Sequence, residues 1–380
     1  MKKIFFVTGE TSGDMHAASL LNELYKIIPK EQMIAKAIGG SHLKDAGADI
    51  FFNSKHLASM GITEVISRLF MYLNLERELL FQLFIFRPDV LVLIDFPGFN
   101  LRIAKKVKTL LPDTKIVYYL PPQVWAWNQR RTKILAKYCD LVLCGLPFEE
   151  KFHKGRGVNA CYVGSPILHE LEKFDREKIR SEFGIKKEDL LIGLFPGSRK
   201  SEIYFMLPVL LKASELLHNI FPQIKFLIAQ APAINLKEAG KVQVLLPGNN
   251  YKLLCASDIL WLTSGTVTLE AALYETPMIL GYRGNMINYF LYLLLKRINM
   301  VGLPNIIYGE KIVPELLQNQ ATPENYYEIT KNWLKKPEEL EKIKKLLKTV
   351  KEKITDKNAS REAALKIREL IPEYKVFVLK

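Results

Sequence analysis

The sequence predicts an α/β protein with two halves, each built around a parallel sheet that carries helices on both faces. Three observations support this prediction. Short runs rich in Val, Ile, Tyr and Phe alternate with stretches whose apolar residues recur at helical spacing, which is typical of βαβ units. This pattern starts again near residue 190. The chain of 380 residues is also longer than a single hydrophobic core ordinarily supports.

The first half contains six apolar runs that we expect to form buried parallel strands. They cover residues 3–8, 34–38, 90–95, 116–120, 141–144 and 162–163. Stretches with the periodicity of amphipathic helices lie between them, at 17–28, 75–86, 101–111 and 133–138. Right-handed crossovers of this kind predict a Rossmann-like sheet.

The second half repeats the arrangement. We expect strands at 190–195, 226–229, 242–245, 259–263 and 278–281, and a long helix at 202–221. The polar, charge-dense stretch 170–189 is expected to join the two halves. Ligands of such sheets bind at the carboxyl ends of the strands, where each glycine-containing turn lies here, so we predict that the halves face a cleft.

We therefore predict an N-terminal domain at 1–170 and a C-terminal domain at 185–357. The Lys- and Glu-rich region 331–357 is either a pair of solvated helices or a basic face that meets acidic lipid headgroups. The final segment, 358–380, is expected to form a helix that packs back on the N-terminal domain.

The net charge of +14 is the unusual feature of the composition. It favours an anionic partner: a phosphate-bearing substrate, an acidic membrane surface or a nucleic acid. We find no signal peptide and no apolar stretch of the roughly 18 residues that cross a membrane. The four cysteines have no C-x-x-C spacing and the six histidines are scattered. These features predict a reduced, cytoplasmic protein without a metal site.

The first glycine-containing turn, GETSGD at 9–14, follows the first apolar run directly. It lacks the G-x-G-x-x-G spacing of dinucleotide-binding loops. One interpretation is a plain turn between strand and helix. The other is a loop whose glycines bring backbone close to a ligand, with Glu10, Ser12, Gly13 and Asp14 at its surface.

Two turns of the second half have the form of anion sites. In LTSGTVTLEA, residues Ser264, Gly265 and Thr266 open a helix whose free N–H groups attract a phosphate, and Glu270 can accept a ribose hydroxyl. In PGSR, Gly197 lets the backbone beside Ser198 come close to a ligand. The Arg199 guanidinium can bind a diphosphate through its several hydrogen-bond donors. The alternatives are a well-capped helix and a surface arginine that caps a helix. Two such turns in one half favour a nucleotide diphosphate.

Asp95 ends an apolar strand in LIDFPGFN, and partial burial there would raise its pKa towards that of a general base. Alternatively, it caps the helix that begins near residue 100. The nearby segment PPQVWAWN contains Trp125 and Trp127. Their rings could form a wall against which a sugar or an acyl chain packs, or they could belong to an ordinary hydrophobic core.

The stretch 61–81 repeats apolar residues at helical spacing. They are Val65, Ile66, Leu69, Phe70 and Leu73, with Arg68 and Arg77 close by. This pattern fits a core helix, or an exposed patch that lies in a membrane interface with its arginines at lipid phosphates.

Taken together, these motifs resemble the lipid A disaccharide synthase family, whose glycosyltransferases have the two-Rossmann GT-B fold. The matching words are GETSGD (9–14), MGITEV (60–65), LIDFPGFN (93–100), VWAWNQRR (124–131), LPFE (146–149), LFPGSRKSEI (194–203), LTSGTVTLEAAL (262–273), PMILGYR (277–283) and LPNII (303–307). Each motif alone is a weak indication of the family, but the whole set in this order is specific to it.

The resemblance implies transfer of 2,3-diacylglucosamine from its UDP derivative to 2,3-diacylglucosamine 1-phosphate (lipid X). The product is the β-1,6-linked disaccharide 1-phosphate, formed with inversion and release of UDP, without a metal or other cofactor. It also implies a peripheral protein at the inner face of the inner membrane of a Gram-negative bacterium. The expected partner is an anionic membrane surface, and a homodimer is one possible state that the sequence leaves open. No nucleic-acid-binding module is recognisable.

By motif match, the resemblance implies that Asp95 and Arg199 take the positions of an essential aspartate and arginine. Asn305 and Glu270 match donor-site residues, and Glu10 and Ser12 match the loop opposite them. Three positions depart from the family pattern, Gly98, Asn128 and Ser165, and they affect acyl-chain or acceptor detail rather than the reaction.

The expected mechanism is a single displacement. Asp95, with Glu10 as its rival, takes the proton of the acceptor's 6-hydroxyl. Arg199 and the N–H groups near Ser264 and Thr266 stabilise the charge on departing UDP. The alternatives are another UDP-sugar enzyme of this fold, such as a UDP-N-acetylglucosamine epimerase or a cell-wall glycosyltransferase, and a non-catalytic protein that binds anionic lipid.

Overall fold

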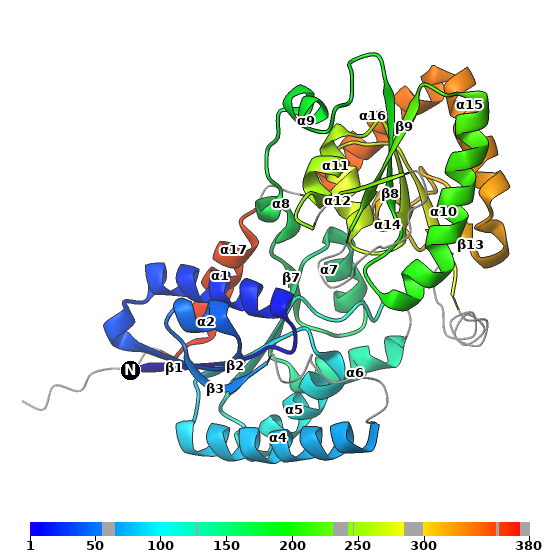
Figure 1. Cartoon of the computed structure of the whole chain (residues 1–380). Coiled ribbons are helices and arrows are strands. Elements are labelled where there is room, and N and C mark those ends of the chain that lie inside the picture. The colour runs from blue at the N-terminus through cyan, green and yellow to red at the C-terminus, as the bar shows by residue number, and fades with distance from the viewer. Residues whose placement is uncertain are drawn as a thin grey trace, which may run out of the picture. The chain divides into compact units, whose positions relative to one another are not determined.

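The computed structural model describes residues 1–54, 65–126, 128–230, 242–245, 247–284, 299–354 and 357–372. The chain forms two compact units. Unit 1 comprises Met1–Pro166 with Asp356–Lys380, and unit 2 comprises Ile167–Thr355. Each unit is built around one parallel sheet with helices against it (Figure 1). The predicted α/β class with two parallel-sheet units is confirmed.

The sheet of unit 1 has the strand order β3-β2-β1-β4-β5-β6-β7, and all neighbouring strands run parallel. Its strands are β1 (Lys2–Val7), β2 (Met33–Gly39), β3 (Asp49–Asn53), β4 (Val90–Ile94), β5 (Lys115–Tyr119), β6 (Leu141–Cys144) and β7 (Ala160–Tyr162). The strand order reverses between β1 and β4. The carboxyl ends of these two central strands are therefore where a ligand site is expected.

Helices cover both faces of this sheet (Figure 1). They are α1 (Thr11–Ile27), α2 (Ser41–Asp45), α4 (Val65–Phe86), α5 (Pro97–Leu110), α6 (Thr132–Tyr138), α7 (Pro147–Lys154) and α17 (Ala359–Leu370), with short 3₁₀ turns η1 (Lys30–Gln32) and η2 (Gln129–Arg131). One hydrophobic cluster joins α1, α2 and α17 to the sheet. A second joins α4, α5 and α6 to its other face.

The C-terminal helix α17 belongs to unit 1 and packs along α1. Ala363, Ala364 and Ile367 of α17 are buried in the same cluster as Leu20 and Leu24 of α1. The two alanines have small side chains, which lets the helices approach closely.

Unit 2 has the strand order β10-β9-β8-β11-β12-β13, again all parallel. The strands are β8 (Leu190–Phe195), β9 (Ile224–Ala229), β10 (Gln243–Leu245), β11 (Ile259–Thr263), β12 (Met278–Tyr282) and β13 (Glu315–Leu317). The helices are α8 (Ile167–Glu170), α9 (Arg176–Glu182), α10 (Lys200–Ile220), α11 (Asn250–Ala256), α12 (Val267–Leu273), α14 (Leu303–Tyr308), η3 (Gln318–Gln320), α15 (Pro323–Lys335) and α16 (Pro337–Lys353).

Trp261 of β11 is the centre of the core on one face of this sheet. Its indole N–H donates to Oγ1 of Thr330 in α15 at 3.1 Å, and its ring lies 5.3 Å from that of Tyr326. All three side chains are buried. The indole is thus both packed and hydrogen-bonded, as a buried tryptophan requires.

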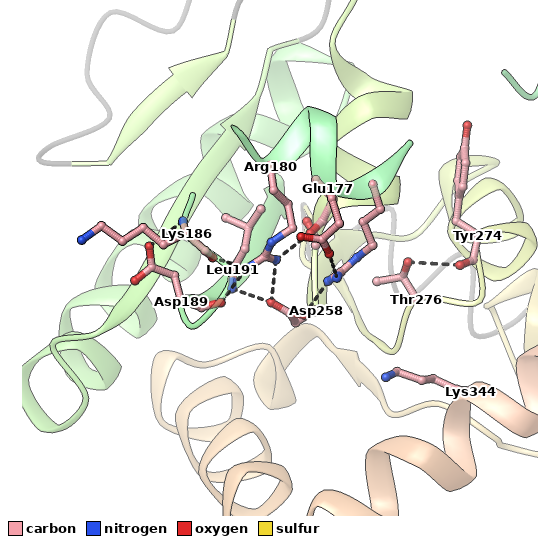
Figure 2. A network of polar contacts seen from close by, with 12 residues as sticks. Glu177, Arg180, Lys186, Asp189, Leu191, Asp258, Tyr274, Thr276 and Lys344 are labelled. Carbon is pink, nitrogen blue, oxygen red and sulfur yellow. Dashed lines mark hydrogen bonds and ion pairs between the residues drawn. The ribbon is translucent and has the colours of Figure 1, made fainter. Parts of the chain in front are cut away.

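A buried arginine ties α9 to the sheet of unit 2 (Figure 2). The Arg180 guanidinium donates to the carboxylate of Asp258 and to the carbonyls of Lys186 and Asp189, at 2.6–3.1 Å. The Asp258 carboxylate also accepts the N–H of Leu191 at the start of β8. Because of this network, the charged stretch that we expected to join the halves contains a helix fixed within unit 2.

Candidate active site

The central strands of unit 1 bring Asp95 and Glu10 to the same edge of the sheet. Asp95 directly follows β4, and Glu10 follows β1 after Thr8 and Gly9. Val7 of β1 pairs with Leu93 of β4. Because the strands are parallel, both acidic residues leave the carboxyl edge side by side.

The segment 9–14 is a loop for only its first two residues. Helix α1 begins at Thr11 with Glu10 at its N-cap. Ser12 and Glu10 are exposed, whereas Gly13 in the first turn is buried. The prediction of a loop through residue 14 is therefore wrong, and the segment is a helix start.

Asp14 has a structural role instead of the predicted place in an acceptor loop. It is only 2% exposed. Its carboxylate accepts the N–H groups of Gly40, His42 and Leu43 at 2.6, 2.9 and 3.3 Å. Asp14 thereby caps α2, and its oxygens are occupied by the chain itself.

Asp95 is held in an unusual backbone conformation. Asp95 and Phe96 have φ angles of 48° and 47°, in the left-handed region that residues other than glycine seldom adopt. Such a conformation costs on the order of 1–2 kcal/mol per residue. The amide of Asn100 donates to the Asp95 carbonyl at 2.9 Å, and the Tyr118 hydroxyl donates to the same oxygen at 2.6 Å. These two bonds fix where the Asp95 side chain leaves the strand.

The alternative interpretation of Asp95 as a helix cap is wrong. Helix α5 begins at Pro97, with Phe96 at its N-cap. Asn100 and Tyr118, which position Asp95, are not among the site residues predicted from the sequence. Asn100 lies inside the LIDFPGFN word, which is the available signal for it, whereas nothing in the sequence marks Tyr118.

The pKa of Asp95 is raised to about 6, first by burial and second by the negative charge of Glu10. The side chain is only partly buried, so one face of the carboxylate remains accessible. A carboxylate with this pKa is ionised at neutral pH and is a stronger base than an ordinary aspartate. This combination suits proton removal from a hydroxyl group.

An aromatic cluster borders Asp95. The Phe96 and Phe99 rings stack at 4.9 Å, and Tyr72 of α4 lies 5.7 Å from Phe96. A Cβ atom on Gly9 would lie 2.5 Å from the Phe96 ring, so only glycine fits there. The surroundings of the carboxylate are therefore apolar on this side.

Trp125 is a core residue rather than an exposed wall. Its indole N–H donates to Oε1 of Glu149 at 2.9 Å, and its ring meets Phe148 edge-on. Burial raises the pKa of Glu149 to about 7. This bond connects the VWAWNQRR and LPFE words. Trp127 lies outside the described residues.

The two predicted anion turns of unit 2 lie side by side. They follow β8 and β11, which pair through Phe195 and Leu262. In the first turn Gly197 has φ 119°, and a Cβ there would lie 2.6 Å from that of Glu202. Glycine is therefore required at this position.

Glu202 occupies the backbone donors of this first turn. It accepts the N–H groups of Ser198 and Arg199 at 3.0 and 3.2 Å, and it pairs with the Arg199 guanidinium at 3.2 Å. The Arg199 side chain is nevertheless 81% exposed. An anion at this turn would therefore be bound by the guanidinium rather than by the backbone.

The second turn does offer backbone donors. The N–H groups of Gly265 and Thr266 donate to no atom within the described parts of the chain. Both residues are exposed, and a Cβ on Gly265 would have no atom of the described residues within 4 Å. Ser264 donates its N–H to Gly281, and Glu270 is partly buried in α12.

Asn305 is not available to a ligand, contrary to the prediction that it belongs to the donor site. It is 0% exposed. Its amide donates to the carbonyl of Val313 and to Glu315, and its oxygen accepts the N–H groups of Ile312 and Val313, at 2.8–3.0 Å. Asn305 therefore holds α14 to the segment that leads into β13.

The predicted membrane patch lies partly outside what is described. Nothing is described of the side chains of Val65, Ile66, Leu69 and Phe70. Leu73 is exposed, as are Phe81, Phe84 and Ile85 on the same helix. Within the described residues, no helix combines the length and the apolar character needed to span a bilayer.

Solved structures of similar fold include UDP-sugar enzymes. A UDP-GlcNAc 2-epimerase from Neisseria meningitidis bound to UDP-GlcNAc has a TM-score of 0.65 at 14% identity, covering 97% of this chain and 100% of its own. A glycosyltransferase from Rickettsia africae has a TM-score of 0.56 at 14% identity, covering 98% and 99%. The fold is that of GT-B glycosyltransferases and related epimerases.

Sequence relatives identify the family. The family model described as lipid-A-disaccharide synthetase matches residues 4–368. Lipid-A-disaccharide synthase from Nitrosococcus oceani is 37% identical over 361 residues, covering 92% of each chain. The enzyme from Myxococcus xanthus is 34% identical over 383 residues, covering 98% of this chain and 99% of its own. The chain belongs to the lipid-A-disaccharide synthase family and is a glycosyltransferase.

Proposed function

We propose that this enzyme transfers 2,3-diacylglucosamine from UDP-2,3-diacylglucosamine to lipid X, 2,3-diacylglucosamine 1-phosphate. The observation that supports the proposal most directly is the environment of the Asp95 carboxylate. This group is a partly buried carboxylate with a pKa raised to about 6, fixed by two hydrogen bonds to its own carbonyl. The family to which the chain belongs supports the choice of substrates.

Asp95 acts as the general base in this proposal. It accepts the proton of the acceptor's 6-hydroxyl while that oxygen forms a bond to the anomeric carbon of the donor. The bond from this carbon to UDP breaks on the opposite side, UDP leaves with the electron pair, and the configuration inverts. Burial and, second, the negative charge of Glu10 raise the pKa of Asp95 to about 6, which makes it a stronger base than an ordinary aspartate.

Unit 2 binds the departing diphosphate. The exposed Arg199 guanidinium and the N–H groups of Gly265 and Thr266, which have no acceptor among the described residues, supply preorganised positive charge where negative charge develops. Gly197 and Ser198 shape the turn that presents Arg199. Ser264 and Glu270 complete the donor site, whereas Asn305 supports it only from within the core.

We propose that this reaction needs no metal ion. Within the described residues, no three His, Cys, Asp or Glu side chains are grouped so that they could hold a metal. The proposed role of Arg199 is the charge stabilisation that a metal supplies in other glycosyltransferases. A chelator tests this point directly.

We also propose that the enzyme docks on an anionic membrane surface through α4. Both proposed substrates carry acyl chains, and the exposed Leu73, Phe81, Phe84 and Ile85 suit contact with lipid. The positive net charge of +14 adds attraction to acidic headgroups.

Release of UDP tests the proposed reaction. Purified enzyme is incubated in detergent and EDTA with UDP-2,3-diacylglucosamine, with and without lipid X. Release that depends on lipid X, accompanied by a disaccharide 1-phosphate product, is the expected result. Release that is independent of lipid X, or none from folded protein, would contradict the proposal.

A further inference from the structure

Phe96 and Tyr72 form an aromatic wall beside the proposed base. Phe96 directly follows Asp95, and the ring of Tyr72, from α4, lies 5.7 Å from the Phe96 ring. Both residues are partly exposed, whereas Phe99 is buried and stacks on Phe96 at 4.9 Å. The aromatic wall is therefore an accessible apolar surface next to Asp95. The reaction described so far makes no use of it.

The Phe96 side of the aromatic wall is fixed by the backbone around it. Phe96 has a φ angle of 47°, in the left-handed region, which directs its ring away from the usual path of a strand. A Cβ atom on Gly9 would lie 2.5 Å from Cγ of Phe96, so the ring fills the space that a side chain at residue 9 would need. Because Phe96 packs on the backbone of Gly9, its ring is held beside Asp95 before any ligand binds.

The Tyr72 side is fixed because α4 is tied to α5. Glu76 lies one turn after Tyr72 on α4 and is only 3% exposed. Its carboxylate pairs with the Arg102 guanidinium at 2.8 Å and with the ammonium group of Lys106, both on α5. Helix α5 begins at Pro97, next to the base, so these ion pairs keep Tyr72 near Asp95. A preformed surface of this kind lowers the entropic cost of binding.

The aromatic wall continues into apolar surface along α4. Leu73 directly follows Tyr72 and is exposed, and Phe81, Phe84 and Ile85 are exposed further along the same helix. A hydrocarbon chain that leaves the wall along α4 would therefore remain against apolar side chains. A sugar ring can also stack on an aromatic face, but a sugar is too short to use this continuation. The observed continuity favours a chain as the ligand.

We propose that Phe96 and Tyr72 bind the first methylene groups of an acyl chain of the acceptor and thereby set the acyl length that the enzyme prefers. The inference rests on the proposed function, in which Asp95 contacts the 6-hydroxyl of the acceptor. The acyl chains leave the same sugar ring, so they start within one sugar of the carboxylate. Burial of one methylene group raises affinity about fourfold, so a wall of this kind distinguishes chains by length.

The test measures UDP release with acceptors that differ only in acyl length, from four to eight carbons, at a fixed concentration of one donor and of detergent. Wild-type kcat/KM should rise by about tenfold or more over this range. In Tyr72→Ala the rise should be smaller by about fourfold or more, while kcat/KM for the shortest acceptor should change less than about threefold. Tyr72→Gln lacks the ring but keeps a longer side chain, and it should show the same loss if the alanine variant does not fold.

Two variants serve as controls. Tyr72→Phe keeps the ring and should show the wild-type rise in kcat/KM with acyl length. Tyr25→Ala removes a partly exposed tyrosine from α1 of the same unit, and it should also keep this rise. The comparison separates loss of the ring beside Asp95 from loss of a tyrosine elsewhere in unit 1.

Three results would overturn the inference. Equal losses with all acceptors in Tyr72→Ala would mean that the ring contacts the sugar or supports only the fold. Wild-type kcat/KM that does not depend on acceptor length would exclude a wall that binds the chain. A loss that follows the acyl length of the donor alone would assign the wall to the donor. Wild-type enzyme that releases no UDP even with lipid X would instead overturn the proposed function, and the inference with it.

Discussion

A Cβ atom on Gly13 would lie 3.1 Å from Oδ2 of Asp95, so the first turn of α1 packs directly against the carboxylate. Glycine in a helix costs about 1 kcal/mol relative to alanine. The position nevertheless holds glycine, because any side chain would press on Asp95. Helix α1 thus contributes to the site through the absence of a side chain as well as through Glu10.

This contact predicts that Gly13→Ala separates stability from activity. The added methyl group should displace the Asp95 carboxylate and lower kcat by about tenfold or more, because misplacement of a reacting group by a fraction of an ångström to one ångström is costly. The thermal midpoint should stay unchanged or rise. Steady-state kinetics and thermal unfolding provide the two measurements. Gly98→Ala is the matched control, since a Cβ there meets no atom of the described residues within 4 Å, and it should keep full activity. Full activity in Gly13→Ala would show that the close packing of residue 13 against the Asp95 carboxylate is not needed for catalysis.

Arg199→Ala should remove most of the activity without destabilising the protein. Loss of one preorganised donor at a developing charge typically costs about 10²–10³ in rate. The side chain is 81% exposed and, among the described residues, pairs only with its neighbour Glu202, so little stability depends on it. UDP release by the variant measures the effect, and Lys200→Ala on the adjacent exposed residue should be near wild type. Retention of more than about a tenth of the activity would exclude the proposed role.

The exposed face of α4 predicts a change in membrane binding. Phe81→Ser combined with Phe84→Ser should weaken binding to vesicles that contain anionic lipid by about tenfold or more, since burying one such ring contributes about 1.5–3 kcal/mol. Co-sedimentation with phosphatidylglycerol vesicles measures this. Ile220→Ser removes an equally exposed apolar side chain from unit 2 and serves as the control. Undiminished binding by the double variant would show that another surface docks.

His153 predicts a loss of stability in acid. Burial lowers the pKa of His153 from 6.5 to about 4, and the charge of Arg156 adds to this effect. The unfolded chain therefore binds a proton before the folded one does. The contribution of His153 to stability is complete above pH 6.5 and is lost as the pH falls towards 4.

Urea unfolding at pH 7 and pH 5 checks this prediction. His153→Leu should lose less stability between these two values than wild type does. At pH 7 it should be neutral or stabilising, because neither imidazole nitrogen has a hydrogen-bond partner in the described structure. His218→Leu alters an exposed histidine and should leave the pH dependence as in wild type. An unchanged slope in His153→Leu would refute the argument.

The sequence predicts the strands that are apolar along their length. β4 and β8 are examples, because a parallel strand covered on both faces has a continuous apolar run. It does not predict β3, whose side chains are exposed or only partly buried, or β13, which has three residues. Neither has the continuous apolar run that reveals β4 and β8. Length alone does not decide this, because the three-residue edge strands β7 and β10 are predicted, at 162–163 and 242–245.

For the candidate site residues, prediction from the sequence fails for a different reason. Asp95 and Arg199 are predicted from their positions after apolar strands and from motif order. Asp14 and Asn305 occur in the same motifs, but their side chains bind backbone groups of the chain itself. Sequence spacing cannot separate these two uses of a polar side chain. The left-handed conformation of Asp95 has no sequence signal either, because it depends on Asn100 and Tyr118.

The pH dependence of kcat/KM in Glu10→Gln tests the central claim, that Asp95 is the base and Glu10 raises its pKa. Wild-type activity should fall about tenfold per pH unit below pH 6. In Glu10→Gln this acidic limb should move to lower pH while activity near pH 8 is kept, and Asp95→Asn should be inactive throughout. Glu10→Gln that is as inactive as Asp95→Asn, or that keeps the limb at pH 6, would contradict the account.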